Sequence, residues 1–95
     1  MVDNQFKPDR YGGIEIKDMA LLPDTEEAFR SSLKQWIVDW ESQGVRSVQI
    51  FFAPPKCHLM NTAFEVGFYF HHAHQKQAYV LMILWLDKKV ACRVP

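Results

Sequence analysis

Apolar residues recur along this chain with two different periods, and the periods separate strands from helices. Residues 14–17 alternate apolar and charged side chains, which is the period of a strand. A longer segment instead repeats apolar residues every three or four positions, along one stripe of a helix: Phe29, Leu33, Trp36, Ile37 and Trp40. We expect this stripe to face the core of the protein.

Polar residues and a glycine mark where this helix begins and ends. Asp24 is placed to cap the first turn, and Glu27 follows three residues later, at the spacing of a capping box. Gly44 supplies the left-handed residue with which helices often stop. The sequence therefore predicts a helix that starts after Asp24 and ends before Gly44.

The second half of the chain contains the patterns of three more strands and one short helix. Residues 45–52 are rich in β-branched and aromatic side chains, and residues 59–66 suit a helix that Gly67 ends. An aromatic strand over residues 68–73 and an apolar strand over residues 79–86 follow, joined by a polar turn. This half is therefore predicted to add a strand, a helix and two further strands.

The connections between these elements predict the fold class. A short polar turn joins antiparallel strands, whereas a helix can cross over between neighbouring strands. We therefore expect one α/β (α+β) domain with the order β-α-β-α-β-β. Its mixed sheet should end in an antiparallel hairpin, and each helix should connect strands that lie side by side.

The aromatic strand contains the candidate interaction residues Phe68, Phe70, His71 and His72. Strand alternation places Phe68 and Phe70 on one face and Tyr69 and His71 on the other. It also sends the adjacent histidines to opposite faces, and no nearby Cys, Asp or Glu completes a set of metal ligands. We therefore predict structural roles for the two imidazoles and no metal site.

The remaining residues that could take part in catalysis or ligand binding match no known motif. Cys57 and His58 are adjacent, and neighbouring side chains rarely face each other as a nucleophile and its base. Gly12-Gly13 lacks the further glycine, lysine or serine of a phosphate-binding loop. The sequence predicts no catalytic and no cofactor-binding residue.

Composition limits the partners and the setting of the protein. A chain of 95 residues with 48% hydrophobic content suits a single core, and eleven basic and eleven acidic side chains give no overall field for nucleic acid or an anionic membrane. Two cysteines are too few for a disulfide framework, and the chain has neither the apolar core of a signal peptide nor an apolar run of membrane-spanning length. We expect an intracellular protein of the cytoplasm, nucleus or mitochondrion, with neither nucleic acid nor membrane as partner.

Several segments together resemble a known family. They are Tyr11-Gly12-Gly13-Ile14, the apolar helix that leads to Gly44-Val45-Arg46-Ser47-Val48, Leu59 and Ala63 before the segment Gly67-Phe68-Tyr69-Phe70-His71-His72-Ala73, and Leu84-Trp85-Leu86. With these the chain resembles the N-terminal, pre-Nudix domain of Nudix hydrolases of the type-6-like group, which includes the fibroblast growth factor antisense protein and plant Nudix enzymes. It departs from the family pattern at Gln49, where a tryptophan is common, and in having two prolines after that strand.

The resemblance implies a domain division and a place for the chemistry. Residues 1–10 would be a leader, residues 11–87 a pre-Nudix domain with a fold like that of GNAT-type N-acetyltransferases, and residues 88–95 the start of a linker to a Nudix domain. The glutamate-rich Nudix box, G-x5-E-x7-R-E-x2-E-E-x-G, does not occur in these residues. Mg²⁺ is therefore expected only in the Nudix domain that would follow.

The resemblance also implies the function. The chain would be an accessory domain that positions or dimerises a Nudix hydrolase acting on nucleoside diphosphate derivatives such as ADP-ribose or NADH, and would not be catalytic by itself. Its partner would be a second copy or its own Nudix domain. The alternatives are a freestanding protein-interaction module and a small acyltransferase, the second disfavoured because no acyl-CoA pyrophosphate loop is found.

Overall fold

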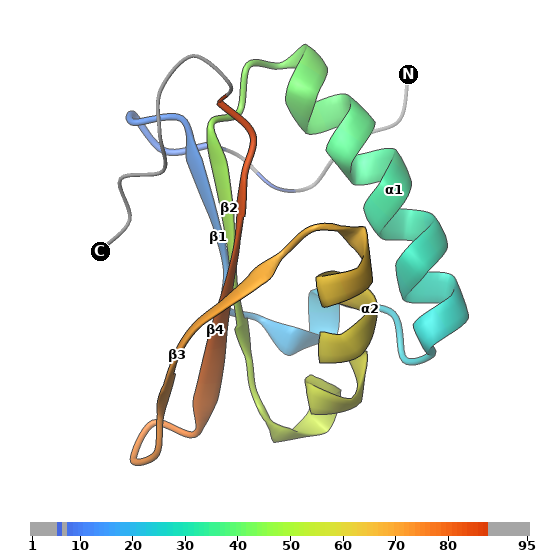
Figure 1. Ribbon diagram of the computed structural model, residues 1–95, viewed down its shortest axis with the longest axis vertical. Coiled ribbons are helices and arrows are strands. Elements are labelled where there is room, and N and C mark those ends of the chain that lie inside the picture. The colour runs from blue at the N-terminus through green and yellow to red at the C-terminus, as the bar shows by residue number, and fades with distance from the viewer. Residues whose placement is uncertain (1–5, 7, 88–95) are drawn as a thin grey trace.

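A mixed four-stranded sheet carries two α-helices on one of its faces (Figure 1). The computed structural model describes Phe6 and residues 8–87. The strands are Gly13–Ile16 (β1), Ser47–Phe52 (β2), Tyr69–His74 (β3) and Tyr79–Trp85 (β4), and the helices are Glu26–Ser42 (α1) and Met60–Val66 (α2). Two short 3-10 helices, Met19–Leu21 (η1) and Pro54–Leu59 (η2), precede α1 and α2. The predicted mixed α/β class with two helices and a four-stranded mixed sheet is confirmed.

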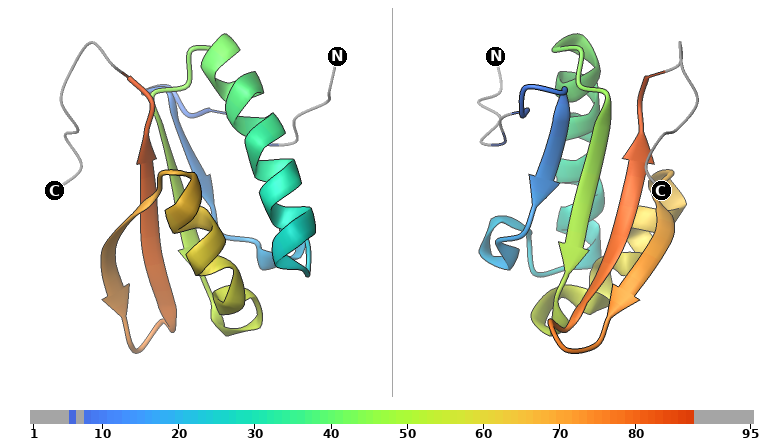
Figure 2. Two further views of the ribbon diagram at one scale, coloured as in Figure 1. Left: turned by 45° about the vertical axis from the view of Figure 1, so that its right-hand side comes forward. Right: turned by 90° about the vertical axis from the view of Figure 1, so that its left-hand side faces the viewer.

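The order of strands across the sheet is β1-β2-β4-β3, with β1 parallel to β2 and both pairings of β4 antiparallel. The C-terminal hairpin of β3 and β4 is therefore confirmed. Helix α1 connects neighbouring strands as expected. The same expectation for α2 is wrong, because β4 lies between β2 and β3 (Figure 2).

The central position of β4 follows from its composition. Leu81, Met82, Ile83 and Leu84 are consecutive and all buried, so this strand has no polar face to offer to solvent. A strand of that kind favours a central place in the sheet, with pairing on both edges. The hairpin therefore folds back so that β4 pairs with β2, and β3 takes the edge of the sheet.

The main core lies between the sheet and α1. Phe29, Leu33 and Trp40 are fully buried, and Trp36 and Ile37 pack partly buried beside them, so the predicted helical stripe is confirmed. The sheet contributes mostly alternate residues to this core: Ile14, Ile16, Val48, Ile50, Phe52, Met82 and Leu84.

Phe6 also belongs to this core, although it lies in the segment expected to be a leader. It is 6% exposed, and its ring lies 5.0 Å from that of Trp36 and 5.9 Å from that of Trp40, between ring centroids. A leader boundary at residue 10 stays a prediction. The predicted linker, residues 88–95, lies outside the described residues.

Helix α1 begins one residue later than its sequence suggests. The N-cap is Thr25, whose hydroxyl oxygen accepts a hydrogen bond from the Ala28 amide at 3.1 Å. The predicted capping box of Asp24 and Glu27 is therefore wrong. The carboxylate of Asp24 is engaged by Lys56, from a distant part of the chain, and the neighbouring threonine caps the helix instead.

Both predicted glycine stops are present. Gly44 has φ +78°, and the Val45 amide beyond it donates to the Trp40 carbonyl at 2.9 Å, which satisfies one of the last carbonyls of α1. Gly67 has φ +126° and ends α2. At both positions a side chain would be strained, so the two glycines are fixed by backbone conformation.

Candidate functional site

Strand β3 contains a β-bulge at the adjacent histidines. Phe70 pairs with Met82 and His72 pairs with Leu81, so His71 is an extra residue with no partner on β4. The expectation that His71 and His72 point to opposite faces is therefore wrong, because a bulge interrupts the alternation of side chains. Their ring centroids lie 4.7 Å apart, and the two Nδ1 atoms are in hydrogen-bond contact.

The ring of Tyr79 contacts His72 of this histidine pair and two further aromatic side chains. Its ring lies 5.9 Å from that of His72, stacks on that of His74 at 5.5 Å, and meets the edge of Phe51 at 5.1 Å. Among the described residues, no group of three or more His, Cys, Asp or Glu side chains is placed to hold a metal ion. The expectation of no metal site stays a prediction.

The two candidate phenylalanines have different environments. Phe68 precedes β3 and is 1% exposed, so it belongs to the core and is not available to a partner. Phe70 is 54% exposed and stacks on Phe64 of α2, which is 55% exposed, with ring centroids 5.6 Å apart and an interplanar angle of 26°. We call Phe64 and Phe70 the aromatic pair; it replaces Phe68 and Phe70 as a candidate contact surface.

Sequence reasoning missed Phe64 although a signal was present. Leu59 and Ala63 are four residues apart and both fully buried, so they define the inward stripe of the second helical segment. Phe64 follows Ala63 and lies about 100° further round the helix, away from that stripe. A large apolar side chain outside a buried stripe is therefore predicted to be exposed.

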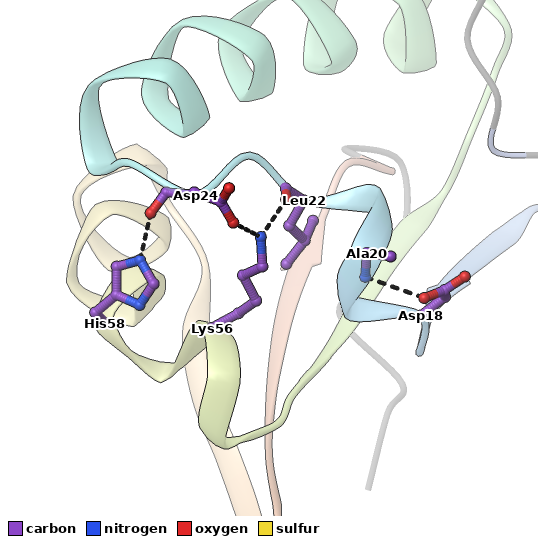
Figure 3. Close-up of polar contacts among 6 residues, drawn as sticks. All are labelled: Asp18, Ala20, Leu22, Asp24, Lys56 and His58. Atoms are coloured by element: carbon purple, nitrogen blue, oxygen red, sulfur yellow. Dashed lines mark hydrogen bonds and ion pairs between the residues drawn. The ribbon is translucent and has the colours of Figure 1, made fainter.

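A buried lysine fixes the segment before α2 to the segment before α1 (Figure 3). Lys56 is 8% exposed, and its Nζ donates to the Leu22 carbonyl and to the Asp24 carboxylate, each at 2.6 Å. His58 Nε2 forms a third bond, 2.6 Å long, to the Asp24 carbonyl. The ammonium group of Lys56 lowers the pKa of the Asp24 carboxyl, chiefly through the hydrogen bond between them. We call these contacts the Lys56 clip.

The clip holds η2 at one wall of a cavity. The cavity has a volume of about 460 Å³, is open to solvent and lies between η2 and the outer end of the β3–β4 hairpin. Cys57 lines it, whereas the neighbouring His58 bonds to Asp24. The described residues that line it are Phe52, Pro54, Cys57, Ala73, His74, Gln75, Ala78, Tyr79 and Val80.

The fold and these surfaces define a small two-layer α/β domain with an exposed aromatic pair, a cluster of imidazoles and a mainly apolar cavity. Comparison with known families gives a match over residues 5–86 to the family described as the Nudix hydrolase domain. The chain therefore belongs to the Nudix hydrolase family, as an N-terminal domain of that family, and the resemblance seen in the sequence is confirmed.

Several proteins of Arabidopsis thaliana are similar to this chain. Nudix hydrolase 5 is 32% identical over 80 residues, which cover 84% of this chain and 26% of that protein. Nudix hydrolase 2 is 31% identical over 81 residues, or 85% and 28% of the two chains, and Nudix hydrolase 6 is 30% identical over 82 residues, or 86% and 28%. The chain thus spans about a quarter of the length of the curated relatives it matches. No helix among the described residues is both long enough and apolar enough to cross a membrane.

Proposed function

We propose that this chain is an accessory domain of a Nudix hydrolase, which positions the catalytic domain and does not itself hydrolyse substrate. The proposal is supported by family membership, by the match to a quarter of each relative, and by the lack of a Nudix box in these 95 residues. The enzyme would act on nucleoside diphosphate derivatives such as ADP-ribose or NADH, with Mg²⁺ held by its Nudix domain. An intracellular location and a GNAT-like arrangement of the elements are part of the same proposal.

The exposed aromatic pair carries this proposal. Phe64 and Phe70 each leave more than half of their surface to solvent. Covering on the order of 100 Å² of each ring would contribute about 2.5 kcal/mol per ring at ~25 cal/mol per Å². The sum of about 5 kcal/mol only just meets the low end of the roughly 4–15 kcal/mol that free association costs. Docking within one polypeptide needs less buried area, because the effective concentration of the two domains is high, so the pair is large enough for such docking.

The edge strand supports the same choice. Strand β3 lies at the edge of the sheet, where a second copy could add its own β3 and form a dimer. The bulge at His71 breaks the regular spacing of backbone groups that such pairing requires. We therefore place docking on the Nudix domain of the same polypeptide first, and a homodimer through this edge second.

Two measurements test the proposal. The 95-residue chain alone, given ADP-ribose and Mg²⁺, should release no AMP, and release that depends on Mg²⁺ would contradict the accessory role. In the second, the ¹⁵N-labelled chain is titrated with the separately expressed Nudix domain of the same gene. Amide shifts should concentrate at the aromatic pair, and Phe70→Ser should weaken binding, whereas Val38→Ser should not. Val38 is 59% exposed on α1 and provides a matched apolar control away from the pair.

The freestanding interaction module uses the same aromatic pair for a different protein. It differs from the first proposal in the size of the native polypeptide. Mass spectrometry of the endogenous protein separates the two: peptides of a glutamate-rich Nudix box in the same chain support the accessory domain. A native protein confined to these 95 residues supports the freestanding module.

A further inference from the structure

The cavity beside the hairpin has the size of a small-molecule site. Its volume of about 460 Å³ falls within the roughly 300–1,000 Å³ typical of ligand pockets. Phe52 and Val80 of the sheet line it together with Pro54 and Cys57 of η2. Phe52 is fully buried and η2 is held by the Lys56 clip, so two of the surfaces that form the cavity are fixed.

Two small residues of the hairpin keep this space open. Ala73 and Ala78 both line the cavity, and alanine is the smallest side chain that either position could carry apart from glycine. Ala78 has φ +54°, a left-handed conformation in which glycine or asparagine costs less than alanine. This conformation closes the β3–β4 turn, in which the Ala78 amide donates to the Gln75 carbonyl at 3.1 Å, and it places Ala78 in the cavity wall.

The lining chemistry selects a class of ligand. None of the described residues that line the cavity is Asp, Glu, Lys or Arg. A charged ligand would therefore find no Asp, Glu, Lys or Arg counter-charge among these residues. The available polar groups are the thiol of Cys57, the amide of Gln75 and the imidazole of His74, and the Tyr79 ring offers an aromatic surface.

We propose that the cavity between η2 and the β3–β4 hairpin is a binding site for a neutral, mainly apolar aromatic molecule with a single polar group. The ring packs against Tyr79, Val80 and Pro54, and the polar group meets Gln75 or the Cys57 thiol. The site is separate from the aromatic pair and does not depend on the proposed docking of a Nudix domain. It also differs in kind from a site for a nucleoside diphosphate, which carries negative charge.

Three matched probes test both the site and its preference for neutral ligands. Indole, indole-3-acetate and tryptamine share one ring system and are neutral, anionic and cationic near neutral pH. Each is titrated into the ¹⁵N-labelled chain while amide shifts are followed. Indole should give saturable shifts at Cys57, Ala73 and Ala78, and the two charged probes should bind at least about tenfold more weakly, a difference of 1.4 kcal/mol.

Variants that fill the cavity locate the binding. Ala73→Leu places a larger side chain at an exposed position of an edge strand and should weaken indole binding at least about tenfold. Ala28→Leu, at an exposed position of α1, is the matched control and should leave binding unchanged. If Ala73→Leu fails to fold, Cys57→Met fills the cavity from the opposite wall and serves the same purpose.

The chemistry of Cys57 gives an independent readout. In a Cys92→Ser background, saturating indole should slow alkylation of Cys57 by iodoacetamide. Absence of saturable shifts up to the solubility limit of indole would overturn the proposal. Equal binding of the three probes, or undiminished binding in both cavity-filling variants, would overturn it as well.

Discussion

The Nζ atom of Lys56 lies 2.6 Å from a carboxylate oxygen of Asp24, a residue 32 positions earlier in the chain. The lysine is almost completely buried, whereas the side chain of Asp24 is 92% exposed. The ammonium group of Lys56 therefore forms its ion pair with Asp24 at the surface, and the aliphatic part of the lysine side chain packs beneath it. This contact joins the segments that precede the two α-helices.

Replacing Lys56 with methionine should destabilise the protein. The substitution keeps most of the apolar stem but removes the donor to the Leu22 carbonyl, and a hydrogen bond from a charged group contributes about 1.5–3 kcal/mol. We expect the free energy of unfolding, measured in urea, to fall by about that amount. Lys34→Met, at an exposed position of α1, is the control and should change it by less than about 0.5 kcal/mol. An equal effect of the two variants would show that the clip contributes nothing.

The lowered pKa of Asp24 predicts the direction of a pH dependence. Its ordinary value is 3.8, and Lys56 holds it lower in the folded protein. A carboxyl with a lower pKa in the folded than in the unfolded state stabilises the fold above its unfolded pKa, and this contribution is lost as the pH falls through the folded pKa. Urea unfolding between pH 7 and the acid range should therefore show a smaller loss of stability in Asp24→Asn than in the unchanged protein. Parallel curves for the two proteins would exclude this linkage.

Trp40 should be among the most sensitive core positions. Its side chain is fully buried and packs against Phe6 and Trp36, and truncation of a buried tryptophan to alanine costs about 3–5 kcal/mol. That is most of the stability of a domain near the lower end of the usual range of about 5–15 kcal/mol. Trp40→Ala should barely fold by circular dichroism, whereas Val38→Ala, two residues away and exposed, should melt like the unchanged protein. A cooperative melt of Trp40→Ala at the original temperature would contradict the position of this residue in the core.

The aromatic pair should show a measurable energetic coupling within the folded domain. Stacked aromatic pairs contribute about 0.5–1.5 kcal/mol beyond the area they bury. A double-mutant cycle of Phe64→Ala and Phe70→Ala, followed by urea unfolding, should give a coupling energy in that range. The cycle of Phe64→Ala with Tyr11→Ala, another exposed aromatic residue, should give none. Zero coupling in the first cycle would mean that the two rings do not stack in solution.

The bulge in β3 predicts an unusual tolerance to deletion. Phe70 pairs with Met82 and His72 with Leu81, so removal of His71 leaves the pairing continuous on both sides. We expect the deletion variant to fold, and cross-strand nuclear Overhauser effects should persist between Phe70 and Met82. Deletion of Val80 from the central strand is the comparison and should abolish folding, because β4 is paired on both edges. Loss of folding on deletion of His71 would contradict the bulge.

Features that depend on neighbouring residues could be predicted from the amino-acid sequence. The stripe from Phe29 to Trp40 and the stops at Gly44 and Gly67 follow from helical period and from backbone conformation, and both are local properties. The family could also be recognised, because its motifs are continuous segments of the chain. The Phe64 side chain could have been assigned to the surface from the same local pattern.

Features that depend on distant partners became visible only in the folded protein. Three features bring together segments that are apart in the sequence: the insertion of β4 between β2 and β3, the bulge at His71 and the contact of Lys56 with Asp24. A hydrophobic period within one segment does not predict such contacts. The cavity likewise exists only where η2 and the hairpin approach each other. The period of hydrophobic residues predicts which face of a helix or strand is buried. Which other element packs against that face depends on how all the elements share one core.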